Sequence, residues 1–314
     1  MSAFPPERSV LVVGDYFVDL IFSGVSRWPQ RGEEVFATQT MFLAAGAFTQ
    51  QRALHRLGVP ARWAARLGSD PHSKLVLDTA RAEGVDTSAY ILSPGPVRNL
   101  SVAISHAGER GFVSFRESAV PLQVEDLIPA QRPACVLLTE FLRGPRLASI
   151  VHAARRVGTT VFMDGQHIDA TLDDPAVAAA VREVDIFAPN ADEARRLTGH
   201  DDLDRALSTL AGLTRTVVIK NGSHGAVAAS SHERVSFSAP PVTVADTSGA
   251  GGCFDAGFVA GHLFGLGLAG CTALATLCGA LSVTGHGGAA APTLARVAEH
   301  APELVPWATS QQRS

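Results

Sequence analysis

Short apolar runs recur along the chain and alternate with segments of helical periodicity. The runs are four or five residues long, which is typical of buried parallel strands, and they lie at 10–14, 135–139, 160–163, 185–188 and 216–219. Between them, apolar residues recur every three or four positions, which predicts helices over 46–57, 72–83, 145–156, 173–182, 190–197 and 203–211. This alternation predicts an α/β fold with a doubly wound, mainly parallel sheet and helices on both faces. Ligands are then expected beyond the carboxyl ends of the strands.

Two segments break this alternation. Residues 16–42 and 97–115 alternate apolar and polar side chains, so we expect antiparallel strands without intervening helices. The stretch 254–283 is strongly apolar but contains Asp255, His262 and several glycines. It therefore predicts two buried helices of an α/β core rather than a membrane span.

Length and composition limit the class of protein. The 314 residues are long for one domain and short for two, and no linker interrupts them, so we expect a single domain over 1–314. The net charge of −4, without a long basic cluster, excludes a nucleic-acid partner. The start of the chain lacks an apolar leader, and the four cysteines lack Cys-x-x-Cys spacing. We therefore expect a cytoplasmic protein with no membrane partner and no structural metal.

The most informative stretch is 246–258, Asp-Thr-Ser-Gly-Ala-Gly-Gly-Cys-Phe-Asp-Ala-Gly-Phe. Three small residues, Gly249, Ala250 and Gly251, precede apolar residues at helical spacing. A loop of small residues that opens a helix exposes backbone N–H groups without intrahelical partners. Together with the helix dipole, these groups form an anion site that can stabilise charge on a phosphoryl group.

This stretch resembles the signature of the ribokinase-like (PfkB) carbohydrate and nucleoside kinases. That signature runs Asp-Thr-x-Gly-Ala-Gly-Asp and then x-Phe-x-Ala-Gly-Phe, and every fixed position matches except one. The final Asp of its first half takes the proton from the attacking hydroxyl in that family, and it is Gly252 here. The resemblance covers about residues 8–290. It implies a ribokinase-like fold in which 16–42 and 97–115 form a small β-lid over the sugar.

The resemblance also implies partners and cofactors. The partners would be a sugar or nucleoside and a nucleotide, with ATP and Mg²⁺ as the expected cofactors; a monovalent cation and a homodimer through the β-lid are also allowed. The N–H groups of Gly249, Ala250, Gly251 and Gly252 would form an anion hole, and Thr247 would lie beside the nucleotide phosphates.

On the sugar side, Asp19 matches the carboxylate that holds sugar hydroxyls in the family, although Asp15 competes for this role. A carboxylate accepts well from two neighbouring hydroxyls. The family usually reads Gly-Gly-x-x-x-Asn shortly before Leu57-Gly58, and the same positions are Ala44, Ala45 and Thr49 here. Methyl groups and a hydroxyl therefore replace a close backbone approach and an amide, so ordinary sugar recognition is altered.

On the nucleotide side, Asn190 and Glu193 match the family's Asn-x-x-Glu, which positions Mg²⁺ largely through water. The same spacing forms a capping box at a helix start, and the two interpretations are compatible. Lys220 and Gly222 match a Lys-x-Gly near the phosphates, where the alternative is a strand-end lysine in a turn. Asp164 ends a predicted strand and is a further candidate for substrate binding in the same crevice.

The absence of a carboxyl group at residue 252 bears on which function we expect. A positioned general base contributes roughly 10²–10⁴ in rate, and Gly252 cannot supply one. We do not expect Asp255 to replace it, because many members of the family carry Asp at the matching position beside an intact base. Since Ala44, Ala45 and Thr49 depart in the same site, natural divergence is favoured over an engineered change of one residue.

Three functions follow. The first is a sugar or nucleoside kinase with weak or lost activity. The second is a non-catalytic, ligand-binding pseudokinase. The third is a hydrolase or lyase that reuses the anion hole on a phosphorylated or nucleoside substrate. The frequency of kinases in the family favours the first, and the residue chemistry favours the second or third.

Overall fold

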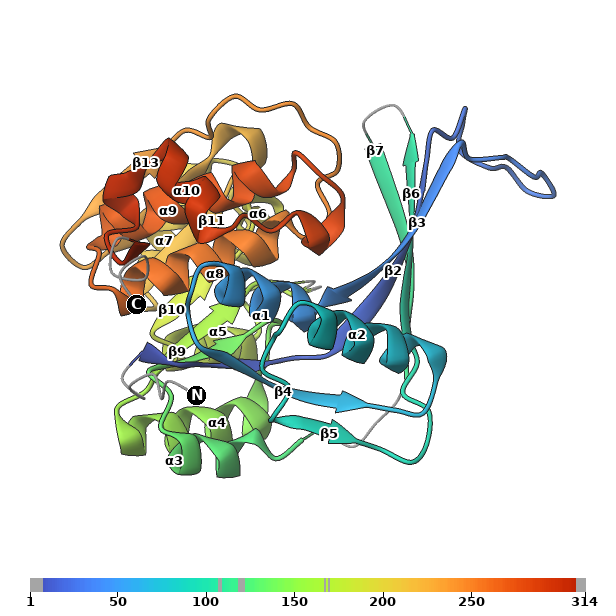
Figure 1. The fold of residues 1–314 in the computed structure, drawn as a ribbon. Coiled ribbons are helices and arrows are strands. Elements are labelled where there is room, and N and C mark those ends of the chain that lie inside the picture. The colour runs from blue at the N-terminus through green and yellow to red at the C-terminus, as the bar shows by residue number, and fades with distance from the viewer. Residues whose placement is uncertain (1–7, 107–108, 118–121, 167, 169, 309–314) are drawn as a thin grey trace.

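The computed structural model describes residues 8–106, 109–117, 122–166, 168 and 170–308. Its centre is a nine-stranded sheet in the order β13-β12-β11-β10-β9-β8-β1-β4-β5 (Figure 1). The strands are β1 (Val10–Val13), β4 (Ala61–Leu67), β5 (Tyr90–Leu92), β8 (Cys135–Leu138), β9 (Thr160–Asp164), β10 (Ile186–Ala188), β11 (Thr216–Lys220), β12 (Ala226–Ser230) and β13 (Arg234–Phe237). All neighbours from β5 to β11 pair in parallel, and β12 and β13 extend the sheet antiparallel.

Helices cover both faces of this sheet, and the side chains of β1 contribute to the apolar core on each face. Val10 and Val12 face one apolar cluster, and Leu11 and Val13 face the other, because successive side chains point to opposite sides of a strand. The first cluster includes residues of α1 (Ala47–Arg56), α2 (Pro71–Ala82), α8 (Ala250–Leu263), α9 (Leu268–Ser282) and α10 (Leu294–His300). The second includes residues of α3 (Leu127–Gln131), α4 (Gly144–Val157), α5 (Pro175–Glu183), α6 (Ala191–Thr198) and α7 (Leu203–Ala211). These observations confirm the predicted fold class.

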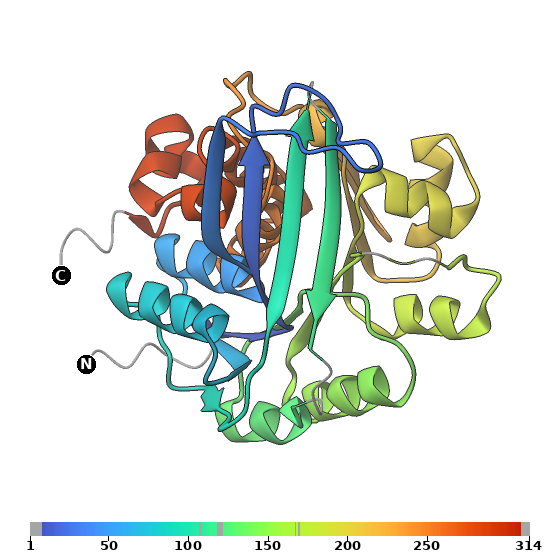
Figure 2. The same ribbon diagram turned by 90° about the vertical axis from the view of Figure 1, so that its right-hand side faces the viewer.

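A second sheet stands beside the first, and we call it the β-lid (Figures 1 and 2). It consists of β2 (Tyr16–Ser23), β3 (Gln39–Gly46), β6 (Asn99–His106) and β7 (Glu109–Arg116), in the order β3-β2-β6-β7. Its two hairpins are antiparallel as expected, but β2 and β6 pair in parallel. The antiparallel expectation was wrong at this pair because the chain returns to the central sheet between β3 and β6, and a crossover of that kind permits parallel pairing.

The predicted helices and buried strands are present within two residues of their expected bounds. Strands β4, β5, β12 and β13 were missed, and β4 shows why: Arg62 and Arg66 interrupt its apolar run, although most of the strand is buried. The stretch 254–283 forms α8 and α9 as expected. Within the described residues, no helix is long and apolar enough to cross a membrane. Short 3₁₀ turns complete the elements: η2 (Val124–Asp126), η3 (Gly222–His224), η4 (Gly287–Ala290) and η5 (Pro302–Leu304).

Candidate functional site

The N-terminus of α8 presents unbonded backbone N–H groups. Gly249 is the N-cap with φ +81°, and a Cβ atom there would lie 2.9 Å from the Gly288 nitrogen, so the turn requires glycine. The Cys253 N–H donates to the Gly249 carbonyl at 3.0 Å. In the described part of the chain, no carbonyl or side-chain acceptor reaches the N–H groups of Gly251 and Gly252. Two donors and the positive end of a 14-residue helix therefore face outward, which suits an anion.

Asp246 fixes the loop that precedes the helix. Its carboxylate accepts from the Ser248 N–H at 3.1 Å and from the Gly287 N–H at 2.7 Å, and its side chain is buried. The loop is thereby tied to η4 across the helix start. Thr247 lies exposed on the same turn, and its carbonyl accepts from the Ala250 N–H at 3.3 Å.

Lys220 ends β11 and reaches under the start of α8. Its Nζ would lie 3.8 Å from a Cβ atom at Gly251, and it donates to Asp164 at 2.6 Å and to Asp255 at 3.1 Å. Burial by itself lowers the pKa of Lys220, but the charges of Asp164, Asp255 and Glu193 more than offset this and raise it. The ammonium therefore stays charged beside the anion site.

Asp255 is fully buried on the inner side of α8, one turn beyond Gly252. Burial raises its pKa well above the ordinary range, the nearby Asp164 raises it further, and Lys220 opposes both. Its Oδ1 is bonded to Lys220, and its Oδ2 has no hydrogen-bond partner within the described residues. This carboxyl group is part of the support for Lys220 and does not stand at the mouth of the site.

Asn190 and Glu193 form the capping box of α6. The Asn190 side chain accepts from the Glu193 N–H at 2.9 Å, and the Glu193 carboxylate accepts from the Asn190 N–H at 2.7 Å. Gly165 follows β9, and a Cβ atom there would lie 2.9 Å from a Glu193 oxygen. Glu193 therefore lies close to the end of β9, where Asp164 stands, and its charge acts on Lys220.

The β-lid contributes Asp19 to the same side of the molecule. Burial and, to a smaller extent, the charge of Asp246 together raise the pKa of Asp19 to about 6, so the lid carboxyl lies within electrostatic range of the α8 loop. Asp15, which competed for the same role, is about half exposed and pairs with Arg116 at 3.5 Å.

Ala44, Ala45 and Thr49 are buried where β3 leads into α1. Thr49 packs behind the anion site: its methyl group would lie 3.3 Å from a Cβ atom at Gly249, and its hydroxyl would lie 2.5 Å from one at Gly288. Thr49 therefore fills space around the α8 loop.

Gln50 was not identified from the sequence, and it lies directly against Gly252. A Cβ atom at Gly252 would lie 3.0 Å from Gln50 Cδ, 3.1 Å from its Nε2 and 3.2 Å from its Oε1. Gln50 is 6% exposed, and its Oε1 is buried without a hydrogen-bond partner in the described part of the molecule. The one available signal was its position next to Thr49, because only the packing of α1 on α8 brings residues 50 and 252 together.

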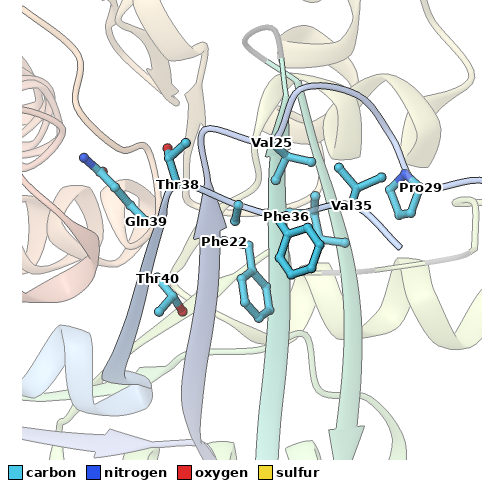
Figure 3. A pocket seen from close by; sticks show the side chains of 10 residues that line it. Phe22, Val25, Pro29, Val35, Phe36, Thr38, Gln39 and Thr40 are labelled. Atoms are coloured by element: carbon cyan, nitrogen blue, oxygen red, sulfur yellow. The ribbon is translucent and has the colours of Figure 1, made fainter. Parts of the chain in front are cut away.

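Thr49 and Gln50 of α1 and Lys220 of β11 thus lie against the start of α8, with Asp164 and Asp255 bonded to Lys220. The charge of Asp246 acts on Asp19 of the β-lid. Gly222 is exposed with φ +55° in the turn after β11, and no atom lies within 4 Å of a Cβ atom placed there. A separate hollow of about 390 Å³ lies on the β-lid (Figure 3). Its lining is mainly apolar, includes Phe22, Val35 and Phe36, and contains none of these candidate residues.

The chain belongs to the pfkB family of carbohydrate kinases, whose pattern it matches over residues 7–294. It is 30% identical over 302 residues to a fructokinase of Klebsiella pneumoniae, covering 88% of this chain and 94% of that one. It is 26% identical over 266 residues to a ribokinase of Arabidopsis thaliana, covering 79% of this chain and 69% of that one.

Solved structures share the fold. Arabidopsis thaliana ribokinase complexed with ribose and ATP superposes with a TM-score of 0.77 at 22% identity, covering 95% of this chain and 98% of that one. Ribokinase from Thermotoga maritima gives a TM-score of 0.75 at 19% identity, covering 93% and 98%. The fold is therefore that of the ribokinases.

Proposed function

We propose that this protein binds a nucleoside triphosphate and a sugar-like or nucleoside ligand as a PfkB carbohydrate kinase does, but transfers the phosphoryl group slowly or not at all. The observation that carries the proposal is Gly252, which stands in the first turn of α8 without a side chain. The next carboxyl group along the helix, Asp255, is fully buried and bonded to Lys220, so it does not offer a base to a bound hydroxyl.

The nucleotide side of the site supports phosphate binding. The N–H groups of Gly251 and Gly252 and the charged Lys220 are donors of the kind that hold phosphoryl oxygens. Asp164 and Glu193 supply the carboxylate oxygens that Mg²⁺ prefers, and an ion that keeps most of its waters suits them. When bound, Mg²⁺ would neutralise charge on the phosphates. The Arabidopsis ribokinase complex with ribose and ATP supports the same ligand classes here.

The ligand side supports binding of hydroxyl groups. Asp19 is partly buried, and its pKa of about 6 leaves it mostly ionised at neutral pH, so it can accept from two neighbouring hydroxyls. Ala44, Ala45 and Thr49 are buried, and Thr49 packs against the α8 loop, which leaves fewer polar partners for a sugar on that side. Ligand recognition therefore rests more on the β-lid than on the segment before α1.

Binding and turnover, measured separately, test the proposal. Isothermal titration with ATP and Mg²⁺ should show specific binding, and the melting temperature should rise by mass action. ADP release with D-ribose, D-fructose or adenosine should be at least roughly a hundredfold below the roughly 1–100 s⁻¹ of ordinary kinases, which is the lower bound of a general base's contribution. Turnover within that ordinary range would refute the proposal, and so would failure to bind ATP.

A further inference from the structure

Two neighbouring glutamines on α1 are buried, and only one has its amide satisfied. Gln51 donates to the Asp86 carbonyl at 2.7 Å and to the Ala61 carbonyl at 3.3 Å, and it accepts from the Tyr90 hydroxyl at 2.6 Å. Gln50 makes none of these contacts, and its Oε1 is buried without a partner among the described residues. An unsatisfied buried oxygen costs free energy, so its retention calls for a role outside the folded chain's own bonds.

The Gln50 amide lies directly against the place where a side chain at residue 252 would begin. All three of its terminal atoms lie 3.0–3.2 Å from the position of a Cβ atom at Gly252. The unbonded N–H groups of Gly251 and Gly252 are in the same helical turn, and Lys220 reaches Gly251 from below. The amide therefore borders the place where a phosphoryl group would be held.

We infer that Gln50 binds the nucleophile of this site: its amide oxygen accepts a hydrogen bond from the O–H group that attacks a phosphoryl group at the α8 N-terminus. The inference rests on the proposed function, which supplies ATP as the phosphoryl donor. An amide positions the nucleophile but does not remove its proton. Phosphoryl transfer tolerates this because its catalysis is mostly positioning and charge stabilisation.

The step balances without a base. The nucleophile's oxygen forms a bond to the γ-phosphorus of ATP, and the bond from that phosphorus to the β–γ bridging oxygen breaks. ADP leaves with the electron pair of the broken bond. The nucleophile's proton passes to an oxygen of the transferred phosphoryl group and from there to solvent.

The O–H group can come from a bound sugar-like ligand or from water, and products distinguish the two. Transfer to a ligand hydroxyl forms ADP without inorganic phosphate. Attack by water forms equal amounts of ADP and inorganic phosphate. Both are measured with ATP and Mg²⁺, in the presence and absence of D-fructose.

Three variants separate this role from a structural one. Gln50→Met keeps the shape but removes the acceptor, so kcat should fall roughly tenfold, the value of one hydrogen bond, with ATP affinity unchanged. Gln50→Glu places a carboxylate beside the helix N-terminus and should raise kcat above the wild-type value. Gln51→Met is the matched control: it should lower the melting temperature, because three hydrogen bonds are lost, and leave kcat unchanged.

Each outcome decides the inference. Equal kcat values for wild type and Gln50→Met would overturn it, and a wild-type rate at background that Gln50→Glu does not raise would do the same. ATP binding with either result leaves the proposed function standing and removes only the role of Gln50. Absence of ATP binding in the wild type would remove both.

Discussion

Replacing Gly252 with aspartate tests whether the site lacks only its base. The substitution places a carboxyl group on the first turn of α8, among the unbonded N–H groups of the anion site. An anionic side chain at a helix start is stabilising by roughly 0.3–1 kcal/mol, and glycine is a poor residue for a helix interior. We therefore expect no loss of stability from the change itself.

The contact between Gln50 and residue 252 determines how the structure must adjust to the new side chain. A Cβ atom at residue 252 would lie 3.0 Å from Gln50 Cδ, whereas ordinary contacts are 3.4–4 Å, so the amide must move by a few tenths of an ångström. The amide ends a flexible side chain, and after the movement its Nε2 can donate to the new carboxylate. If only the base is missing, the rate should rise roughly 10²–10⁴-fold, which corresponds to roughly 3–5 kcal/mol of transition-state stabilisation.

ADP release with ATP, Mg²⁺ and D-ribose or D-fructose measures this gain. Gly252→Asn is the matched control, because it fills the same space without a titratable group. A gain shared by both variants would refute the role of the base. No gain in either would mean that Ala44, Ala45 and Thr49 have already removed productive sugar binding, or that the protein performs another reaction.

Three further predictions follow from the charges and surfaces of the structure. Lys220→Met should weaken ATP binding, which calorimetric titration measures. It should also lower the free energy of unfolding by roughly 3–5 kcal/mol at alkaline pH, and by less at acid pH, where Asp255 is protonated. Urea unfolding at the two pH values measures this second effect. The raised pKa of Asp19 lets the folded state keep a proton that the unfolded chain releases. The free energy of unfolding of the wild type therefore falls as the pH rises from about 4 to about 6, and Asp19→Asn should gain stability relative to wild type across this window. If the β-lid forms a homodimer, Val113→Arg, on an exposed apolar position of β7, should yield monomers in sedimentation, and a monomeric wild type would contradict the dimer.

Much of the fold could be predicted from the sequence because its signals are local. A run such as 135–138 is apolar at every position and only four residues long, which is typical of a strand buried on both faces. Strand β4 has the same kind of environment, but Arg62 is exposed at its start and Arg66 lies at its edge, so the apolar run is broken. The missed elements are those in which tertiary packing, rather than pattern, decides the structure.

The candidate site also has features that a local sequence motif predicts and features that depend on tertiary packing. The turn at Gly249 and the capping box at Asn190 are local motifs, and the structure has both. The contact between Gln50 and Gly252 joins residues about two hundred positions apart, and nothing near either residue indicates it. The burial of Asp255 against Lys220 likewise depends on how α8 lies over the end of β11.

Thr49 and Gly252, which both depart from the family signature, lie on facing turns of α1 and α8. A substitution at residue 252 therefore affects the packing of α1. Thr49 packs against Gly249 and Gly288, and the adjacent Gln50 packs against Gly252, so one turn of α1 supports the whole start of α8. A side chain returned to residue 252 meets the Gln50 amide, whose atoms lie 3.0–3.2 Å from the position of its Cβ atom. Restoring a base therefore requires that α1 accommodate it, and Gly252→Asp combined with Gln50→Ala should exceed the single variant in rate if the amide obstructs the new carboxylate. If the amide instead orients the carboxylate, the double variant should be slower than Gly252→Asp alone. The coupling free energy between positions 50 and 252 then has the opposite sign from that expected for obstruction.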